Sequence, residues 1–237
     1  DSIVRHGTGP DNYWWSVTHR NGVTDYYGKS FGSESVDLHS VLCDPVTHNI
    51  AQWMLTESRD QYGNWVRYSY VKESHPSVIH TSLNEGTQVY PERIVYSGFD
   101  TTSGKYSIRF NRDEGRRDII TNARYGFREV TASTLCNIEV VFDGEVLRRY
   151  YFVTENKRES GYKTRLTDMV RMDPPIGDVE CGNILDPDLW SDDSGESDME
   201  GSFGKQDLVR YNFDYYDYPE ANSIFGDAVE IRNLSND

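Results

Sequence analysis

The chain has 237 residues, enough for one large all-β domain or two smaller ones with a real hydrophobic core. Its 39 acidic and 24 basic residues give a formal net charge of −15, which disfavours nonspecific attraction to nucleic-acid phosphates and anionic membrane surfaces. Seventeen tyrosines and five tryptophans on a hydrophilic chain favour half-buried aromatic strand positions over disorder. No apolar run approaches the ~20 residues of a membrane-spanning helix, and the sequence opens with Asp1-Ser2 and not with the charged and apolar regions of a signal peptide. We therefore expect a processed chain or a piece of a longer protein, with no nucleic-acid partner and no membrane insertion.

The first predicted element is a β-hairpin close to the N-terminus. The opening residues are rich in glycine and proline and indicate turns. An aromatic strand over residues 13–19 is followed by Asn21-Gly22 and a return strand over residues 23–27. Asn-Gly is the strongest short-range hairpin signal, because both positions of a two-residue hairpin turn favour positive φ. Residues 28–45 then indicate a loop with one short strand near residues 36–42.

The clearest hairpin lies over residues 52–71. Apolar and aromatic residues alternate with polar ones on both sides of Asp60-Gln61-Tyr62-Gly63-Asn64, which is the period of two expected of strands. Asp and Asn can hydrogen-bond to their own backbone, and Gly supplies a positive φ at no steric cost. We therefore predict a hairpin with a five-residue loop and with Trp53 and Trp65 inside its ladders.

Two more hairpins are predicted after a loop at residues 72–86. The third hairpin joins strands over residues 92–97 and 105–111 through a long polar turn. The charge run RDEGRRD that follows favours a solvated turn with mixed-sign pairs. The fourth hairpin spans residues 134–152, where alternating apolar residues lead into and out of Asp143-Gly144.

The C-terminal third combines strands with an acidic segment. A strand over residues 161–172 ends at Asp173-Pro174-Pro175, because proline removes ladder donors. The next segment is rich in Asp, Glu, Ser and Gly and is typical of an exposed linker. A strand is predicted over residues 207–216 and a short one near residues 229–232. The predicted division is a hairpin-rich β region (residues 1–172), an acidic linker or long loop (173–206) and C-terminal strands that return to the sheet (207–237).

These elements predict an all-β fold. No stretch shows sustained 3.6-residue periodicity apart from a short one at residues 219–225. We therefore predict an antiparallel sheet built from consecutive β-hairpins.

Four motifs in order resemble the SpvB/TcB toxin-complex family and the related Rhs/YD-repeat shell proteins. They are WSVTHRNGVTDYYG at residues 15–28, the hairpin from Trp53 to Tyr70 with its D-x-x-G-N turn, RIVYSG at residues 93–98, and LCNIEV at 135–140 with RYYF at 149–152. The resemblance covers about residues 12–172. Each motif alone is weak, because hairpins are common, and the ordered set carries the specificity.

The resemblance implies a noncatalytic structural segment of a secreted or extracellular bacterial toxin. In such proteins consecutive hairpins spiral into a hollow β-shell that encloses or delivers a toxic polypeptide. The implied partners are the remaining shell segments of the same or a partner toxin-complex protein. The residues expected to matter are structural, namely the turn residues Asn21, Gly22, Asp60, Gly63, Asn64, Asp143 and Gly144 and the ladder aromatics Trp15, Trp53, Tyr68 and Tyr70.

Several kinds of chemistry are not predicted. Some SpvB proteins carry a separate ADP-ribosyltransferase domain that depends on Glu-x-Glu, and no two glutamates here stand two residues apart. The sequence DPPIG at residues 173–177 is one residue longer than the D-P-x-G of self-cleaving Rhs shells, so a turn is favoured. There is no C-x-x-C, H-E-x-x-H or G-x-S-x-G pattern, and His75 and His80 lack further ligands of evident spacing. We expect no enzyme, no cofactor and no metal, although a carboxylate pair for glycoside hydrolysis stays open, because its partners would lie on different strands.

Two residue groups leave alternatives open. Cys43, Cys136 and Cys181 are odd in number and far apart, so they predict no disulfide framework but permit a single bridge. The acidic residues at 186–200 could supply oxygens for calcium, but they lack the ligand order of an EF-hand, and a solvated linker is favoured.

The alternative function is a secreted glycan-binding β-sandwich module. In that case Trp14, Trp15, Trp65 or Trp190 would stack on sugar rings from an exposed face. An exposed, coplanar aromatic platform would favour this module, whereas aromatics packed between successive hairpins would favour the shell.

Overall fold

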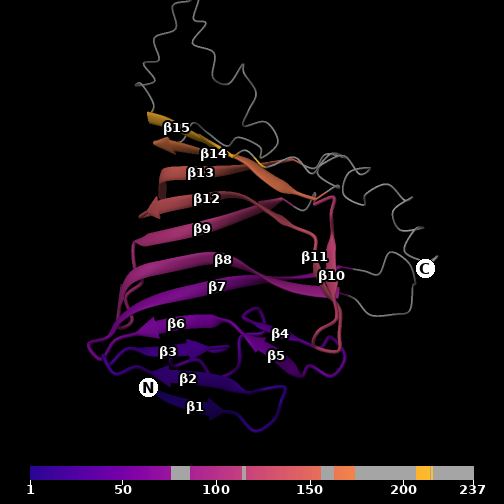
Figure 1. Ribbon diagram of the computed structural model, residues 1–237. Helices are drawn as coiled ribbons and strands as arrows, with labels where there is room; N and C mark the ends of the chain where they lie inside the picture. Colours follow the sequence, from indigo (N-terminus) through magenta and orange to yellow (C-terminus); the bar gives the residue numbers. More distant parts are fainter. Residues whose placement is uncertain (76–85, 114–115, 156–162, 174–206, 214, 216–237) are drawn as a thin grey trace, which may run out of the picture.

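The computed structural model describes residues 1–75, 86–113, 116–155, 163–173, 207–213 and 215 (Figure 1). The first strands are β1 (Ser2–His6), β2 (Trp14–Thr18), β3 (Thr24–Tyr27), β4 (Val41–Cys43), β5 (Ile50–Trp53), β6 (Leu55–Arg59), β7 (Asn64–His75) and β8 (Gly86–Phe99). They are followed by β9 (Tyr106–Asp113), β10 (Ile120–Asn122), β11 (Glu129–Thr131), β12 (Thr134–Phe142), β13 (Glu145–Glu155), β14 (Arg165–Asp173) and β15 (Asp207–Asn212).

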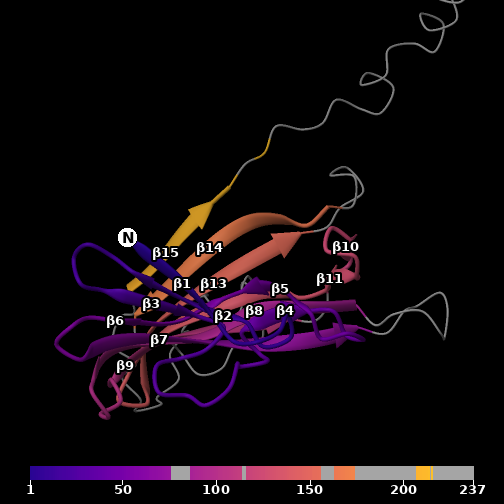
Figure 2. The ribbon, with the colours of Figure 1, turned by 90° about the horizontal axis from the view of Figure 1, so that it is seen from below.

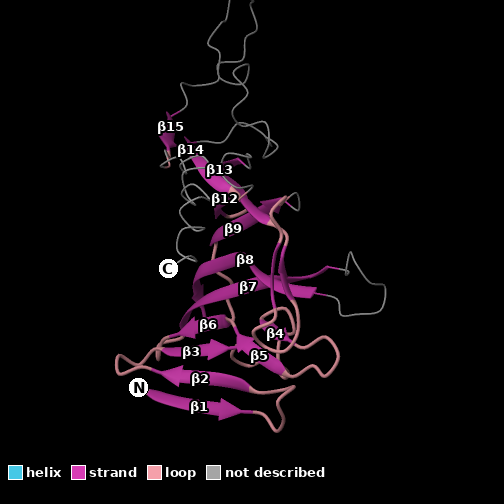
Figure 3. Cartoon of the chain, turned by 45° about the vertical axis from the view of Figure 1, so that its right-hand side comes forward, coloured by secondary structure: helices cyan, strands magenta, loops and turns pink. Residues whose placement is uncertain are grey.

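Thirteen of these strands form one sheet. Its main path runs β1-β2-β3-β6-β7-β8-β9-β12-β13-β14-β15, so the strands lie side by side in nearly the order in which the chain makes them (Figure 1). All pairs along this path are antiparallel. The described residues contain strands, turns and loops but no helix (Figure 3), which confirms the predicted all-β antiparallel class.

The four predicted hairpins are present as pairs of strands adjacent in the sheet. They are β2–β3, β6–β7, β8–β9 and β12–β13. Seen from below, β13, β14 and β15 are rotated relative to β7 and β8 (Figure 2), which is the twist expected of a large sheet.

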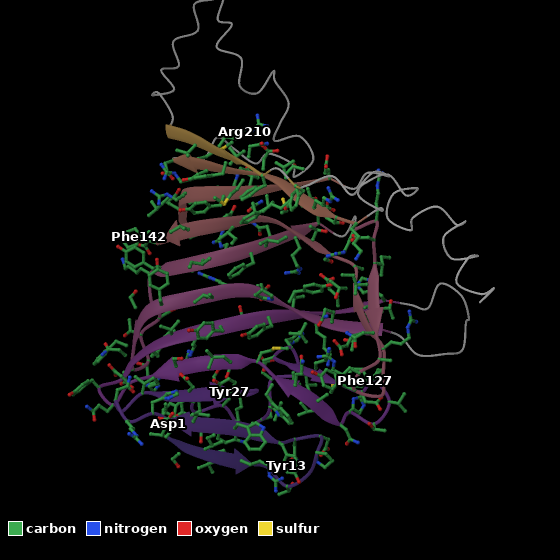
Figure 4. All side chains as sticks on the ribbon, in the orientation of Figure 1. Asp1, Tyr13, Tyr27, Phe127, Phe142 and Arg210 are labelled. Atoms are coloured by element: carbon green, nitrogen blue, oxygen red, sulfur yellow. The ribbon has the colours of Figure 1, made fainter. Side chains whose placement is uncertain are left out.

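Two small pairs of strands pack at one end of the sheet. The pair β4–β5 forms a separate two-stranded sheet, and β10–β11 joins the large sheet through a single parallel bridge from β11 to β8. Leu42 of β4 is fully buried against Val89 of β8 and against Phe127, which precedes β11. Figure 4 shows Phe127 beside this small sheet. These contacts cover the ends of β7 and β8 with apolar side chains.

The core is divided into separate clusters rather than gathered between two layers. Val41, Cys43 and Ile50 form a cluster within the small sheet. Tyr151 of β13 forms another with Val170 and Met172 of β14. The described strands therefore make one long sheet with local coverings, and no second large sheet faces it as in a β-sandwich.

The strand predicted across residues 52–59 is interrupted at Met54. Trp53 ends β5 and pairs with Val41 in the small sheet, whereas β6 begins two residues later, at Leu55. The backbone of Met54 links two other segments, because its N–H donates to Ser40 O (2.8 Å) and its carbonyl accepts from Gly28 N (2.9 Å). Hydrogen bonds to residues distant in the sequence therefore interrupt a stretch that its alternation of apolar and polar residues predicts to be one strand.

Other boundaries also differ from the predictions. The opening residues include β1, which was expected to be turns, because residues 2–6 find a partner in β2. The loop expected at residues 72–86 is strand up to His75 and again from Gly86. Pairing with neighbouring strands extends these strands into residues that show no regular alternation of apolar and polar side chains.

The charge run at residues 112–118, of which residues 114 and 115 lie outside the described part, forms the expected mixed-sign pairs, but the paired side chains are partly buried and not fully solvated. Arg112 lies in β9 and pairs with Glu73 (3.2 Å), and Arg116 pairs with Asp118 (3.0 Å). The carboxylate of Asp118 accepts from the backbone N–H (2.9 Å) and the hydroxyl of Thr164, 46 residues along the chain. Burial raises the pKa of Asp118, but hydrogen bonds from Thr164 and Arg116 outweigh it and lower that pKa to about 2.

Most of the predicted acidic linker lies outside the described residues, as do Trp190 and the short strand expected near residues 229–232. Of the C-terminal part, β15 pairs antiparallel with β14, from Asp207 opposite Asp173 to Asn212 opposite Asp168.

Candidate functional site: turns, ladders and open edges of the sheet

Two of the predicted turns each contain one left-handed glycine. Gly22 has φ +84° and Gly63 has φ +95°. Their N–H groups donate to His19 O (3.0 Å) and Asp60 O (3.3 Å), three residues back. Asn21 does not have a positive φ, so the β2–β3 turn is a three-residue loop closed by a glycine bulge. It is not the two-residue turn that Asn-Gly predicts.

The β6–β7 turn is closed by the carboxylate of Asp60. This group accepts hydrogen bonds from the backbone N–H of Tyr62 and Asn64 (2.9 Å each) and from Asn64 Nδ2 (2.7 Å). The side-chain bond from Asn64 is the main reason why the pKa of Asp60 is lowered. The turn residues are thus held by a local network that favours the ionised carboxylate.

The β12–β13 turn is of the two-residue type. Asp143 has φ +51° and Gly144 has φ +98°, as in the turns that match strand twist. Lys105 Nζ bonds Asp143 Oδ2 at 2.9 Å and connects this turn to the start of β9. Beside it, the ring of Tyr106 stacks on Tyr96 (centroids 5.4 Å apart) and lies tilted against Phe142 (4.6 Å), which Figure 4 labels, so aromatic side chains continue across three strands.

The ladder aromatics occupy two places. Trp15 of β2 meets Trp53 of β5 edge to face, with ring centroids 5.8 Å apart. Tyr68 and Tyr70 lie on β7, opposite Ile94 and Pro91 of β8. The Tyr70 hydroxyl donates to Leu55 O (2.8 Å), and burial raises the pKa of Tyr70 to about 12. Trp53 therefore joins the small sheet to β2, while the tyrosines belong to the centre of the large sheet.

The described tryptophans do not form a coplanar exposed platform. Trp14 stacks on His6 with centroids 3.8 Å apart and planes 12° apart. Trp15 packs against Trp53, and Trp65 is 4% exposed. The geometry predicted for the glycan-binding module through these tryptophans is therefore not observed.

A glycine opposite Trp65 was not singled out from the sequence. Gly98 of β8 pairs with Trp65 of β7, and the indole lies directly over it. A Cβ on Gly98 would come within 2.1 Å of the ring, and Trp65 Nε1 donates to Asp100 O (3.1 Å). The absence of a side chain at this position provides the space that buries the tryptophan on the face of the sheet.

Buried carboxylates with arginine partners also escaped prediction. Glu57 of β6 is 0% exposed and bonds Arg59 Nε through one oxygen (2.7 Å) and Arg67 Nε through the other (2.8 Å). Glu139 of β12 likewise bonds Arg149 of β13 (2.6 Å). Burying a charge is tolerable only when it is paired and hydrogen-bonded. These pairs let charged residues lie inside ladders and crosslink neighbouring strands.

Both ends of the sheet are open among the described strands. β1 pairs only with β2, and β15 pairs only with β14. Ile3 is 67% exposed and Val4 44% exposed on opposite faces of β1, and Tyr211 of β15 is also exposed. An edge strand with exposed apolar side chains and unpaired backbone groups is a template for another strand.

The described residues hold no group of three or more His, Cys, Asp or Glu side chains that could bind a metal ion. Among the described residues there is no helix that is long and apolar enough to cross a membrane. Cys43 is a buried free thiol, and Cys136 is disulfide-bonded. One bridge therefore exists, as the cysteine count permits.

Comparison with solved structures gives several matches of the same fold. A crystal structure of TcdB2-TccC3-Cdc42 matches with TM-score 0.57 and 15% identity, over 72% of this chain and 10% of that chain. The N-terminal domain of effector protein SpvB from Salmonella typhimurium strain LT2 matches with TM-score 0.53 and 16% identity, over 67% and 60%. The Photorhabdus luminescens Tc holotoxin pore matches with TM-score 0.52 and 15% identity, over 68% and 9%. This chain thus spans about a tenth of the toxin-complex chains that it resembles.

No curated protein matches the sequence. Among family models, that of the Salmonella virulence plasmid 65kDa B protein, SpvB, matches residues 3–143. The match covers more than half of the chain and includes the first three hairpins. The chain therefore belongs to the SpvB family.

Proposed function

We propose that this chain is a noncatalytic structural segment of a secreted bacterial toxin, and that it contributes to a β-shell that encloses or delivers a toxic polypeptide. The observation that carries the proposal is a single sheet, ordered along the chain, whose two edge strands have open sides among the described residues. Such a sheet can be extended at either edge by the same antiparallel pairing that builds it.

The interior of the sheet supports a structural role. Three of its buried carboxylates are paired with arginines of the same sheet. Glu57 and Glu139 are bonded to arginines, and Asp168 is bonded to Arg210 (2.8 Å). These carboxylates crosslink strands instead of facing a cleft.

The partners under this proposal are further shell segments of the same or a partner toxin-complex protein. Each would supply a strand to β1 or β15. A disulfide-bonded Cys136 fits a protein that folds in an oxidising compartment and is exported, because such bonds persist there.

We also propose that residues 1–172 act as the hairpin-rich wall, that residues 173–206 serve as an acidic linker or long loop, and that the strand after it returns to the wall.

Hydrogen–deuterium exchange tests the proposal strand by strand. The isolated chain is compared with the same chain extended by the sequence that flanks it in the full-length toxin. The amides of β1 and β15 that point away from β2 and β14 should exchange quickly in the isolated chain and become protected in the longer protein. Amides of β7 and β8 serve as the internal control and should be protected in both. Equal exchange of the edge amides in both proteins would contradict the proposal.

A further inference from the structure

An open groove lies on one face of the N-terminal hairpin. Its floor is formed by alternating side chains of β2 and β3, and its wall by the loop that follows β3. The groove has a volume of about 530 Å³, within the roughly 300–1,000 Å³ of ligand pockets. It lies at the β1 end of the sheet (Figure 1), away from the buried carboxylates of β12 to β14.

The floor carries hydroxyl groups held in fixed positions. Thr18 Oγ1 and Thr24 Oγ1 are 3.1 Å apart on neighbouring strands, and Ser16 Oγ bonds His6 Nε2 at 2.8 Å. Each hydroxyl can both donate and accept. The backbone groups beneath them are used by the pairing of β1, β2 and β3. A ligand here would therefore meet side-chain hydroxyls and not free backbone amides.

The wall presents an aromatic ring that stays exposed. Phe31 is 51% exposed, yet its position is defined by two contacts. Its ring meets Tyr26 edge to face at 5.8 Å, and the guanidinium of Arg59 lies 4.5 Å from its centroid. An apolar ring held in place but left in solvent is a preformed surface for the C–H face of a ligand.

The groove also has a cation without a carboxylate partner. Lys29 Nζ lies 4.9 Å from the centroid of Trp14 and donates to the backbone carbonyl of Glu34 at 3.4 Å. Among the described residues no carboxylate lies within ion-pair distance of it, and no acidic residue lines the groove, although the chain has 39 of them. Glu57, whose strand neighbours Tyr26, is fully buried and paired with arginines. The groove therefore favours an anionic ligand on an otherwise acidic protein.

We propose that this groove binds an acidic saccharide. The sugar hydroxyls would pair with Ser16, Thr18 and Thr24, the C–H face of the ring would pack on Phe31, and a carboxylate or sulfate would pair with Lys29. An acidic peptide is disfavoured on the floor of the groove, because the backbone donors and acceptors of β2 and β3 are already paired with neighbouring strands. The proposal is independent of the shell function and does not use a tryptophan platform, which the described tryptophans do not form.

Titration calorimetry with four probes tests the proposal. They are trigalacturonate, a sulfated galactotriose, neutral galactotriose and hexaglutamate. At least one of the acidic trisaccharides should bind about tenfold more tightly than the neutral one, the order expected for one charge-assisted hydrogen bond. The carboxylated and sulfated probes distinguish the two sources of the negative charge. Hexaglutamate should bind more weakly than the acidic trisaccharide.

Variants assign the binding to the groove. Lys29→Gln should remove the preference for the acidic trisaccharide, and Phe31→Ala should weaken the binding of the acidic and the neutral trisaccharides alike. The matched control is Lys105→Gln, since Lys105 is also exposed but pairs with Asp143 of the β12–β13 turn, far from the groove in the strand order. It should bind as the original chain does. Any of three results would overturn the proposal. The original chain would bind the acidic trisaccharides no more tightly than the neutral one, the Lys29→Gln variant would keep the preference for the acidic trisaccharide, or hexaglutamate would bind as tightly as the acidic trisaccharide.

Discussion

Gly98→Ala is expected to destabilise the fold because of the indole that covers this glycine. The new Cβ would lie 2.1 to 2.3 Å from ring atoms of Trp65, and real Cβ atoms are not found that close to another heavy atom. The ring must therefore move. It then loses its hydrogen bond to Asp100 O, worth about 1 kcal/mol.

Displacement also returns apolar surface to water. If roughly a third of the ~200 Å² buried by a tryptophan is exposed again, the cost is about 2 kcal/mol at ~25 cal/mol per Å². Replacing glycine by alanine within a strand recovers about 0.5–1 kcal/mol of backbone entropy. The expected net loss of unfolding free energy is therefore about 2 kcal/mol.

Urea unfolding followed by far-ultraviolet circular dichroism measures this loss, and a double-mutant cycle with Trp65→Ala isolates its cause. Without the indole, Gly98→Ala should be neutral or stabilise by about 0.5 kcal/mol. If Gly98→Ala costs the same with and without Trp65, the steric explanation is wrong.

Three further predictions concern the turns and the charged ladders. Gly63→Val should cost about 1 kcal/mol or more in urea unfolding, because Gly63 has φ +95° and a β-branched residue is strained there; a cost near zero would contradict this. Glu57→Gln should cost about 2 kcal/mol, below the value for a fully buried pair because one arginine partner is partly exposed, and an unchanged urea midpoint would refute it. The pKa of Asp118 is lowered to about 2, so its contribution to stability is complete above its ordinary value near 3.8 and disappears as pH falls toward 2. Acid unfolding should therefore be less steep over pH 4 to 2 in Thr164→Val, and identical profiles would exclude this contribution.

The local signals of the sequence predicted the hairpins well. Alternation and turn residues act over a few neighbouring positions, so Gly63 and Asp143-Gly144 mark turns whose geometry the chain adopts. The same kind of local signal, Asn21-Gly22, predicted the wrong type of turn between β2 and β3. There the carbonyl of His19 accepts from Gly22 and only the glycine becomes left-handed.

Features that depend on distant partners were not predictable. Nothing near Met54 indicates that the strand should break, because the cause is its bonds to Ser40 and Gly28. The pairing of Glu57 with Arg67 and the space that Gly98 leaves for Trp65 require the strand register. An isolated sequence contains these residues, but it does not show which of them lie opposite one another.

The exposed groove illustrates the same limit. Phe31 lies in a segment predicted only as loop, and its role as a wall depends on Tyr26 and Arg59 from two different strands. The tryptophans within the described residues, which carry the stronger compositional signal for sugar binding, are instead packed against other side chains.

A thermal melt tests the shell proposal most directly. The isolated chain is followed by circular dichroism and by a dye that reports exposed apolar surface, and the extended chain with its flanking sequence is melted in parallel. We predict a broad transition with strong dye binding for the isolated chain, because both sheet edges lack neighbours, and a sharper transition with less dye for the extended one. A sharp, reversible, two-state transition of the isolated chain with little dye binding would mean a self-contained domain and would contradict the proposal.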